Sequence, residues 1–123
     1  MHNTNCAGFL DNIISSGGTR QLSGVPESAI FDVNRGAGAI FITPNATKHF
    51  DEIAIGALRR GASNDGARIL AQVEFDRLNT ALQIVGPNPT VNQKIFENGF
   101  ELVFRAPRQA GQLPALVHAI PIF

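Results

Sequence analysis

The stretch Ala39–Leu58, AIFITPNATKHFDEIAIGAL, predicts a buried strand that runs through a capped turn into a helix. Ala39–Ile42 is rich in isoleucine and phenylalanine, and such residues favour a covered strand. Thr43 suits an N-cap, and Pro44 suits the first helical position, where its missing N–H has no partner to lose. Apolar residues follow at helical spacing and share one side of the helix: Ala46, Phe50, Ile53 and Ala57. We expect the fold to be built around these two elements.

Two chemically active side chains, Lys48 and His49, lie in the first two turns of this expected helix. At about 100° per residue, Lys48 projects nearly opposite the apolar side, and His49 lies at its border, roughly 70° away. A border histidine is half shielded and still reaches solvent, which suits a catalytic base. The same position also suits a histidine that only covers the edge of a core, so both interpretations stay open.

The composition predicts one globular domain. The chain has 123 residues, of which 44% are hydrophobic and 16% charged, and this length can bury a core without disulfides. Ten basic residues balance ten acidic ones, so the basic excess typical of nucleic-acid-binding proteins is missing, although a local basic face is compatible with this balance. Nine Phe supply the aromatic residues, with no Trp or Tyr on which a base could stack.

Several classes of site and location find no support in the sequence. Cys6 is the single cysteine, so no internal disulfide is expected. No apolar run approaches a membrane span, and the start MHNTNCAGF lacks the pattern of a secretory signal. HExxH, paired CxxC and GxSxG patterns are missing, as is a cluster of His with carboxylates at ligand spacing. We therefore expect no metal, no cofactor and no serine nucleophile.

We divide the chain into a flexible N-terminal segment, residues 1–24, and a single α+β domain, residues 25–123. Within the first, Phe9–Ser16 is expected to form one or two helical turns that end at Gly17 and Gly18. The expected elements of the domain are strands Ser28–Val33 and Ala39–Ile42 around the turn Asn34–Gly38, a helix Pro44–Arg60, and a second helix that is capped by Ser63, Asn64 or Asp65 and reaches about Val85. An edge segment Thr90–Phe96 and strands Phe100–Arg105 and Ala115–Ile120 follow, and the alternation along Phe100–Arg105 puts its phenylalanines and Leu102 on one face.

These elements predict an α+β fold, with N-terminal and central helices packed on an antiparallel sheet that ends in a C-terminal hairpin. In that hairpin, Arg105 and His118 lie on neighbouring strands. His118 alternates with Leu116 and Ile120, which favours a histidine that points into the core and is held there by a hydrogen bond. A catalytic role for His118 is the alternative.

The remaining reactive side chains suit cleavage of a phosphodiester without metal. Attack by the 2′-hydroxyl of RNA needs a base, an acid for the leaving 5′-oxygen, and cations near the phosphate. His49, Lys48 and His118 are the catalytic candidates, and Asp51 or Glu52 can orient the first two. The candidate phosphate contacts are Arg105, Arg108 and Arg20. Arg20 lies in a polar connection, where an arginine is more often simply solvated. We expect Lys48 and His49 to face the same cleft as Arg105 and Arg108.

Two segments, ITPNATKHFDE (Ile42–Glu52) and GFELVFRAPRQAGQLPALVHAIP (Gly99–Pro121), resemble the C-terminal toxin domains of bacterial polymorphic and contact-dependent growth inhibition systems. Such domains often end in an aromatic-rich strand, an APR-type loop and a closing strand with His-Ala. With the helix between them, the segments extend the resemblance over most of residues 39–123.

The resemblance implies a domain that is secreted or delivered as part of a larger bacterial protein. It would act on RNA in the cytoplasm of a target cell and be neutralised by a cognate immunity protein. Many such domains are ribonucleases of the barnase, EndoU, colicin and RelE-like fold, and the family implies no particular catalytic residue. The alternatives are a non-catalytic interaction module, such as an immunity or adaptor protein, and a toxin with another target, such as an ADP-ribosyltransferase.

Overall fold

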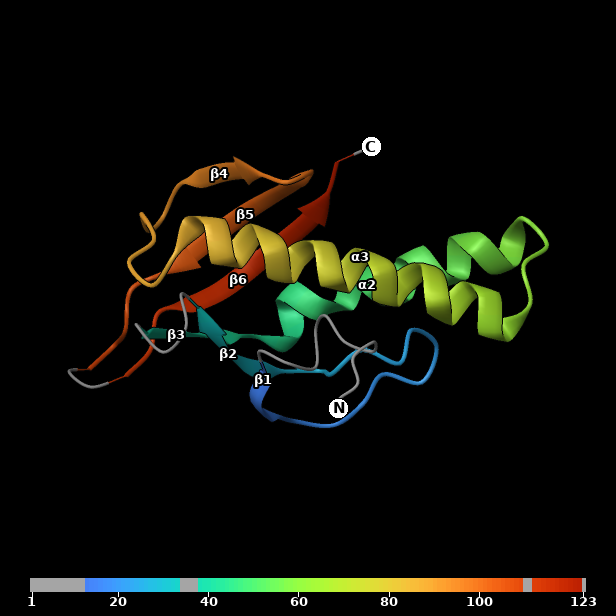
Figure 1. Ribbon diagram of the computed structural model, residues 1–123, viewed down its shortest axis with the longest axis horizontal. Coiled ribbons are helices and arrows are strands. Elements are labelled where there is room, and N and C mark those ends of the chain that lie inside the picture. Colours follow the sequence, from blue (N-terminus) through green and yellow to red (C-terminus); the bar gives the residue numbers. More distant parts are fainter. Residues whose placement is uncertain (1–12, 34–37, 110–111, 123) are drawn as a thin grey trace, which may run out of the picture.

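The computed structural model of the protein describes residues 13–33, 38–109 and 112–122 (Figure 1). In chain order, the elements are β1 (Ile13–Ser16), β2 (Ala29–Val33), β3 (Gly38–Ile42), α2 (Pro44–Arg59), α3 (Asn64–Val85), β4 (Lys94–Glu97), β5 (Phe100–Arg105) and β6 (Ala115–Pro121). Helices α2 and α3 pack on one sheet, so the predicted α+β class is confirmed. Neither of these helices is both long enough and apolar enough to cross a membrane.

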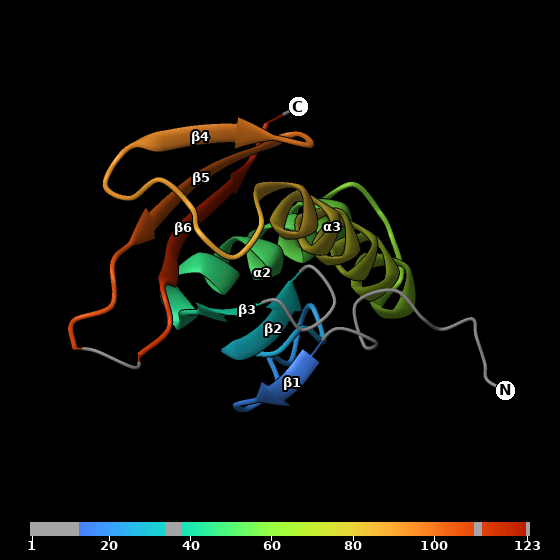
Figure 2. The same ribbon diagram turned by 60° about the vertical axis from the view of Figure 1, so that its left-hand side comes forward.

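The described strands form one sheet in the order β1-β2-β3-β6-β5-β4 (Figure 2). The sheet is mixed rather than wholly antiparallel as expected, because β3 and β6 run parallel. They pair at only two positions, Phe41 with Ala115 and Ile42 with Leu116. A parallel pair needs a long connection, and here α2, α3, β4 and β5 supply it. β6 therefore joins a hairpin from the first half of the sequence to one from the second.

Alternate side chains of the strands pack into a core with the helices. Burial alternates along β2 and β5, as expected for strands with one covered face. Phe75 of α3 meets Phe50 of α2 and Phe31 of β2 edge to face, with ring centroids 5.2 and 5.6 Å apart. We call the opposite side of the sheet the outer face. On the hairpin β5–β6, the outer face carries Glu101, Val103, Arg105 and His118.

Local capping sets the ends of both helices. Thr43 is the N-cap of α2, its hydroxyl accepting from the backbone N–H of Ala46 at 3.3 Å, and Pro44 follows as predicted. Ser63 caps α3 in the same way, through the N–H of Gly66 at 3.0 Å. Between the helices, Gly61 has a φ of 98°, a conformation that glycine adopts without strain. The helix boundaries predicted from these residues are confirmed.

The N-terminal part of the described chain differs from the prediction. Ile13–Ser16 forms strand β1, antiparallel to β2, where the sequence predicted helical turns over Phe9–Ser16. Pairing with β2 outweighs the weak local helical pattern of this short segment. The other predicted positions of that helix, together with Cys6 and most of the predicted turn Asn34–Gly38, lie outside the described residues.

Candidate functional site

A β-bulge places His118 on the outer face of β6. Val103 of β5 pairs with His118, whereas Phe104 pairs with Leu116, so Val117 is an extra residue on β6. An extra residue shifts the alternation of side chains by one position. His118 therefore lies on the face opposite to Leu116, and the prediction that it points into the core is wrong.

The two predicted catalytic histidines, His49 of α2 and His118 of β6, lie side by side. Their rings meet edge to face, with centroids 6.2 Å apart and planes at 76°. Helix α2 reaches this position because it runs along β6 beyond the end of β3, where the Asn45 side chain donates a hydrogen bond to the Val117 carbonyl at 2.7 Å. The side chains of His49 and His118 are 18% and 29% exposed. Both rings are thus shielded on one side and accessible on the other.

Each of the two histidines contacts one carboxylate through one of its ring nitrogens. His49 Nδ1 lies 3.1 Å from Glu52 Oε1, one helical turn away. His118 Nε2 lies 2.9 Å from Glu101 Oε2 on the neighbouring strand β5. Glu101 also lies near a cation, with Oε1 3.8 Å from Lys94 Nζ. The Glu101 side chain is 20% exposed and gives His118 a shielded partner, whereas the Glu52 side chain that contacts His49 is 64% exposed.

These contacts leave one nitrogen of each ring for chemistry. An ionised carboxylate can only accept a hydrogen bond, so the ring nitrogen that faces it carries the proton. In neutral His49 this leaves Nε2 as a proton acceptor, and in neutral His118 it leaves Nδ1. When either ring takes up a second proton, the same nitrogen becomes a donor. The pair can therefore accept a proton at one ring and deliver one from the other.

Lys48 is exposed on α2 beside His49. Among contacts with the described residues, it makes no hydrogen bond or ion pair. Glu52, one turn further along, bonds to His49 instead, which matches the predicted orienting role for Glu52 rather than a surface pair with Lys48. The other carboxylate considered for that role, Asp51, accepts from the backbone N–H of Ser23 at 3.0 Å.

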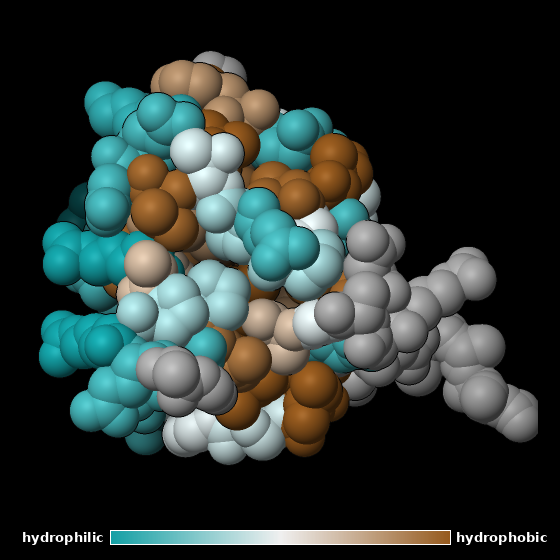
Figure 3. Space-filling view, turned by 90° about the vertical axis from the view of Figure 1, so that its left-hand side faces the viewer, coloured by the Kyte–Doolittle hydropathy of each residue, from teal (hydrophilic) through white to brown (hydrophobic). Residues whose placement is uncertain are grey.

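Arg105 and Arg108 lie at the other end of the outer face. Both line a hollow of about 690 Å³ whose apolar residues include Ile30 and Phe41. The loop that follows β5 closes one side of this hollow, at the end of the molecule seen in Figure 3, where hydrophilic residues in teal adjoin hydrophobic residues in brown. His49 lines a different hollow, so the expectation of one shared cleft is wrong.

The outer face nevertheless connects Arg105 to His118. Arg105 lies two residues along β5 from Val103, which pairs directly with His118. Side chains two residues apart on a strand point to the same side. An extended polyanion that follows β5 would therefore pass from Arg105 to His118 without leaving this face.

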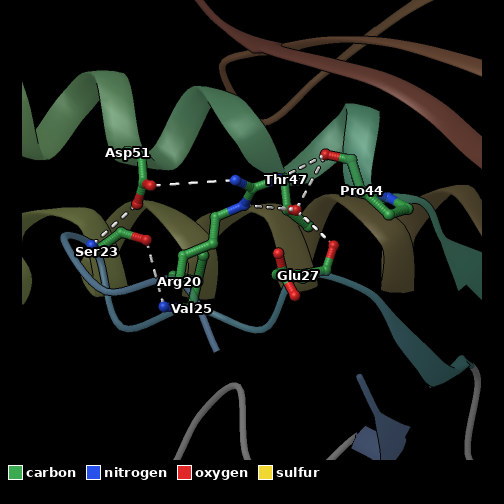
Figure 4. Close-up of polar contacts among 7 residues, drawn as sticks. All are labelled: Arg20, Ser23, Val25, Glu27, Pro44, Thr47 and Asp51. Carbon is green, nitrogen blue, oxygen red and sulfur yellow. Dashed lines mark hydrogen bonds and ion pairs between the residues drawn. The ribbon is translucent and has the colours of Figure 1, made fainter. Parts of the chain in front are cut away.

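Arg20 makes structural contacts with residues of α2 (Figure 4). Its Nε donates to Thr47 Oγ1 at 3.1 Å and its Nη2 to the Pro44 carbonyl at 2.9 Å, while Nη1 lies 4.0 Å from Asp51 Oδ2. The Thr47 hydroxyl in turn donates to the Glu27 carbonyl at 2.6 Å. These contacts fasten the segment before β2 to α2. Arg20 is therefore not grouped with the outer-face cations.

Sequence reasoning missed Glu101 as a member of the site. The alternation of Phe100–Arg105 places Glu101 on the polar side of β5, but its contact with His118 depends on the bulge at Val117. The sequence has no local signal for that bulge. A carboxylate and a histidine on neighbouring strands of a predicted hairpin are the pattern that would have suggested the pair.

The part of the chain that the structure describes contains no group of three or more His, Cys, Asp or Glu side chains that could hold a metal ion. Comparison of the sequence with protein-family models and with curated proteins gave no match.

Proposed function

We propose that the protein is a metal-independent endoribonuclease that cleaves RNA on the outer face of its sheet. One observation carries this proposal: His49 and His118 lie edge to face, 6.2 Å between centroids, and one nitrogen of each ring contacts a carboxylate. Two oriented imidazoles that reach solvent can supply the base and the acid that such cleavage needs. Both side chains remain partly exposed, His49 by 18% and His118 by 29%, so each ring can meet a substrate as well as its carboxylate.

The proposed step is an internal transesterification. One imidazole removes the proton of the 2′-hydroxyl as the 2′-oxygen bonds to phosphorus. The bond from phosphorus to the 5′-oxygen breaks, and the other imidazole protonates that oxygen. The products are a 2′,3′-cyclic phosphate and a 5′-hydroxyl. Lys48 beside His49 supplies positive charge near the phosphate, and Arg105 and Arg108 hold the flanking backbone.

The biological role that we propose is that of a toxin domain. The support is the resemblance of Ile42–Glu52 and Gly99–Pro121 to toxin domains of bacterial competition systems. In that role the domain is delivered as part of a larger protein, cleaves RNA such as tRNA in the target cytoplasm, and is bound by a cognate immunity protein in the producing cell.

The test is incubation of the purified protein with total tRNA and rRNA in EDTA. We expect cleavage by the wild-type protein, a loss of at least about a hundredfold in His49→Ala and in His118→Ala, and cyclic-phosphate ends on the products. Arg59→Ala, an exposed cation at the end of the same helix, is the matched control and should cleave normally. Equal cleavage by all four proteins, or by none, removes the proposal.

A second candidate function, a non-catalytic interaction module, is favoured by exposed apolar residues on α3. Ile69, Val73 and Ile84 are each more than half exposed, which suits contact with another protein. Expression alone in a bacterial cytosol separates the two. Growth arrest that requires His49 supports the nuclease, and normal growth with rescue of an arrested neighbour supports the module.

A further inference from the structure

A hollow of about 580 Å³ opens directly beside His49, between α2, α3 and the end of β6. Its volume falls within the range of small-molecule sites. His49 belongs both to this hollow and to the histidine pair, so a group bound in the hollow would be adjacent to the proposed reaction. The mechanism described above makes no use of this space.

One wall of the hollow is a stripe of α2 that contains a glycine. His49, Ile53, Gly56 and Arg60 follow at spacings of four, three and four, so they share one side of the helix. Glycine within a helix is unfavourable relative to alanine, and Gly56 lies in the last turn of α2, three residues before its end at Arg59. A Cβ built on Gly56 would meet no atom closer than Arg60 Nη1 at 3.4 Å. Packing therefore does not require a glycine here, and its effect is to keep the wall of the hollow open.

The remaining walls combine apolar surfaces with charged edges. Leu70 of α3 and Ile120 of β6 are apolar, and Arg60 lies across Gly56 at one end. Glu74 of α3 also lines the hollow; its side chain is 10% exposed and its Oε1 accepts from Arg77 Nη1. A carboxylate has more lone pairs than one such bond uses, so Glu74 can accept further N–H groups.

We propose that this hollow binds the base of the nucleotide next to the scissile phosphate, an inference that rests on the proposed ribonuclease function. A nucleobase has flat apolar faces and a polar edge, which match the Ile53, Leu70 and Ile120 walls and the Glu74 carboxylate. An arginine guanidinium, as on Arg60, is a common stacking partner for bases. The carboxylate only accepts, and uracil presents its one donor, N3–H, between two carbonyl oxygens that a carboxylate repels. Bases that carry an amino group therefore bind better than uracil.

The test is titration of the protein with AMP, GMP, CMP and UMP, followed by NMR and calorimetry, in wild type and in Gly56→Leu. Leucine is a good helix former, so the variant should fold at least as stably as the wild type while its side chain fills the hollow. We expect mononucleotide binding to weaken by about tenfold or more, and UMP to bind worst in the wild type. Thr80→Leu, which adds the same side chain at an exposed position of α3, should bind as wild type. Gly56→Ala provides a milder variant with an intermediate effect.

Cleavage assays with these variants separate this inference from the proposed function. If the wild-type protein cleaves RNA and Gly56→Leu binds mononucleotides and selects cleavage sites unchanged, the base-binding inference is overturned and the nuclease stands. If mononucleotides bind in a Gly56-dependent way but no RNA is cleaved, the nuclease fails and the hollow remains a nucleotide site. Chemical shift changes confined to residues away from His49 and Leu70 would also overturn the inference.

Discussion

Glu101 of β5 and His118 of β6 are joined across the hairpin by a contact of 2.9 Å between Oε2 and Nε2. The two residues are diagonal neighbours, because His118 pairs with Val103 and Glu101 pairs with Ile120. Because the Glu101 carboxylate contacts Nε2, Nδ1 is the ring nitrogen of His118 that is left for a substrate in the proposed nuclease. In the proposed nuclease, Glu101 is a positioning residue and His118 is the catalytic one.

Glu101→Gln tests this relationship. An amide can donate to the ring nitrogen as well as accept from it, so the tautomer of His118 is no longer fixed. We expect kcat for RNA cleavage to fall by about tenfold or more, with little change in KM or in the free energy of unfolding. Glu97→Gln, on the neighbouring strand β4 and on the opposite face of the sheet, is the control and should cleave as wild type. A normal kcat in Glu101→Gln would contradict the positioning role.

Removal of Arg105 and Arg108 should weaken RNA binding without affecting the chemistry. Each lost phosphate contact is expected to lower the slope of log Kd against log salt by about 0.7 for a single strand. Measurement of Kd for an uncleavable 2′-deoxy oligonucleotide across salt concentrations gives this slope for Arg105→Gln and Arg108→Gln. The control is Arg68→Gln, which removes the same charge from α3, where the Arg68 side chain donates to the Gln21 carbonyl. An unchanged slope in both test variants would exclude these arginines as phosphate contacts.

Arg20 should matter for stability and not for cleavage. Arg20→Ala removes the N–H groups that donate to Thr47 Oγ1 and to the Pro44 carbonyl. We therefore expect a loss of about 1–3 kcal/mol in the free energy of unfolding. Urea denaturation measures this loss. Arg20→Lys keeps the charge but cannot reach both acceptors with one planar group, so it should recover only part of the stability. A stable Arg20→Ala protein with weakened RNA binding would instead indicate a phosphate contact.

Gly99→Ala should destabilise the β4–β5 hairpin more than Gly61→Ala destabilises the helix connection. Both glycines have a positive φ, 83° and 98°. A Cβ at Gly61 would meet nothing within 4 Å, whereas a Cβ at Gly99 would collide with the guanidinium of Arg77, which bonds to the Asn98 carbonyl. We expect a loss of about 1–3 kcal/mol at Gly99 and a smaller one at Gly61. Equal losses would mean that φ alone decides the effect.

The parts of the fold that were predictable from the sequence are those with local causes. Thr43 and Pro44 start α2, Ser63 starts α3, and Asn98 with Gly99, both at positive φ, turns β4 into β5. Each of these effects depends on residues that are neighbours in the chain. The alternation of β5 likewise predicted which of its side chains are buried.

The parts that were not predictable depend on contacts between distant residues. Ile13–Ser16 forms a strand only because β2 is available to pair with it. The bulge at Val117 appears only when β6 is aligned with β5, so neither the direction of His118 nor its contact with Glu101 follows from the sequence. For the candidate site, the sequence identified both histidines and Glu52 but could not predict that the rings meet.

The central position of β6 has a consequence for the order in which the protein is made. A ribosome completes β3 and β5 before β6, so until β6 inserts between them each presents an unpaired edge. His49 likewise has no second imidazole beside it until β6 inserts. A nascent chain would thus be inert toward RNA in the cell that synthesises it, and the proposed activity would begin only when the strand between the two hairpins is in place.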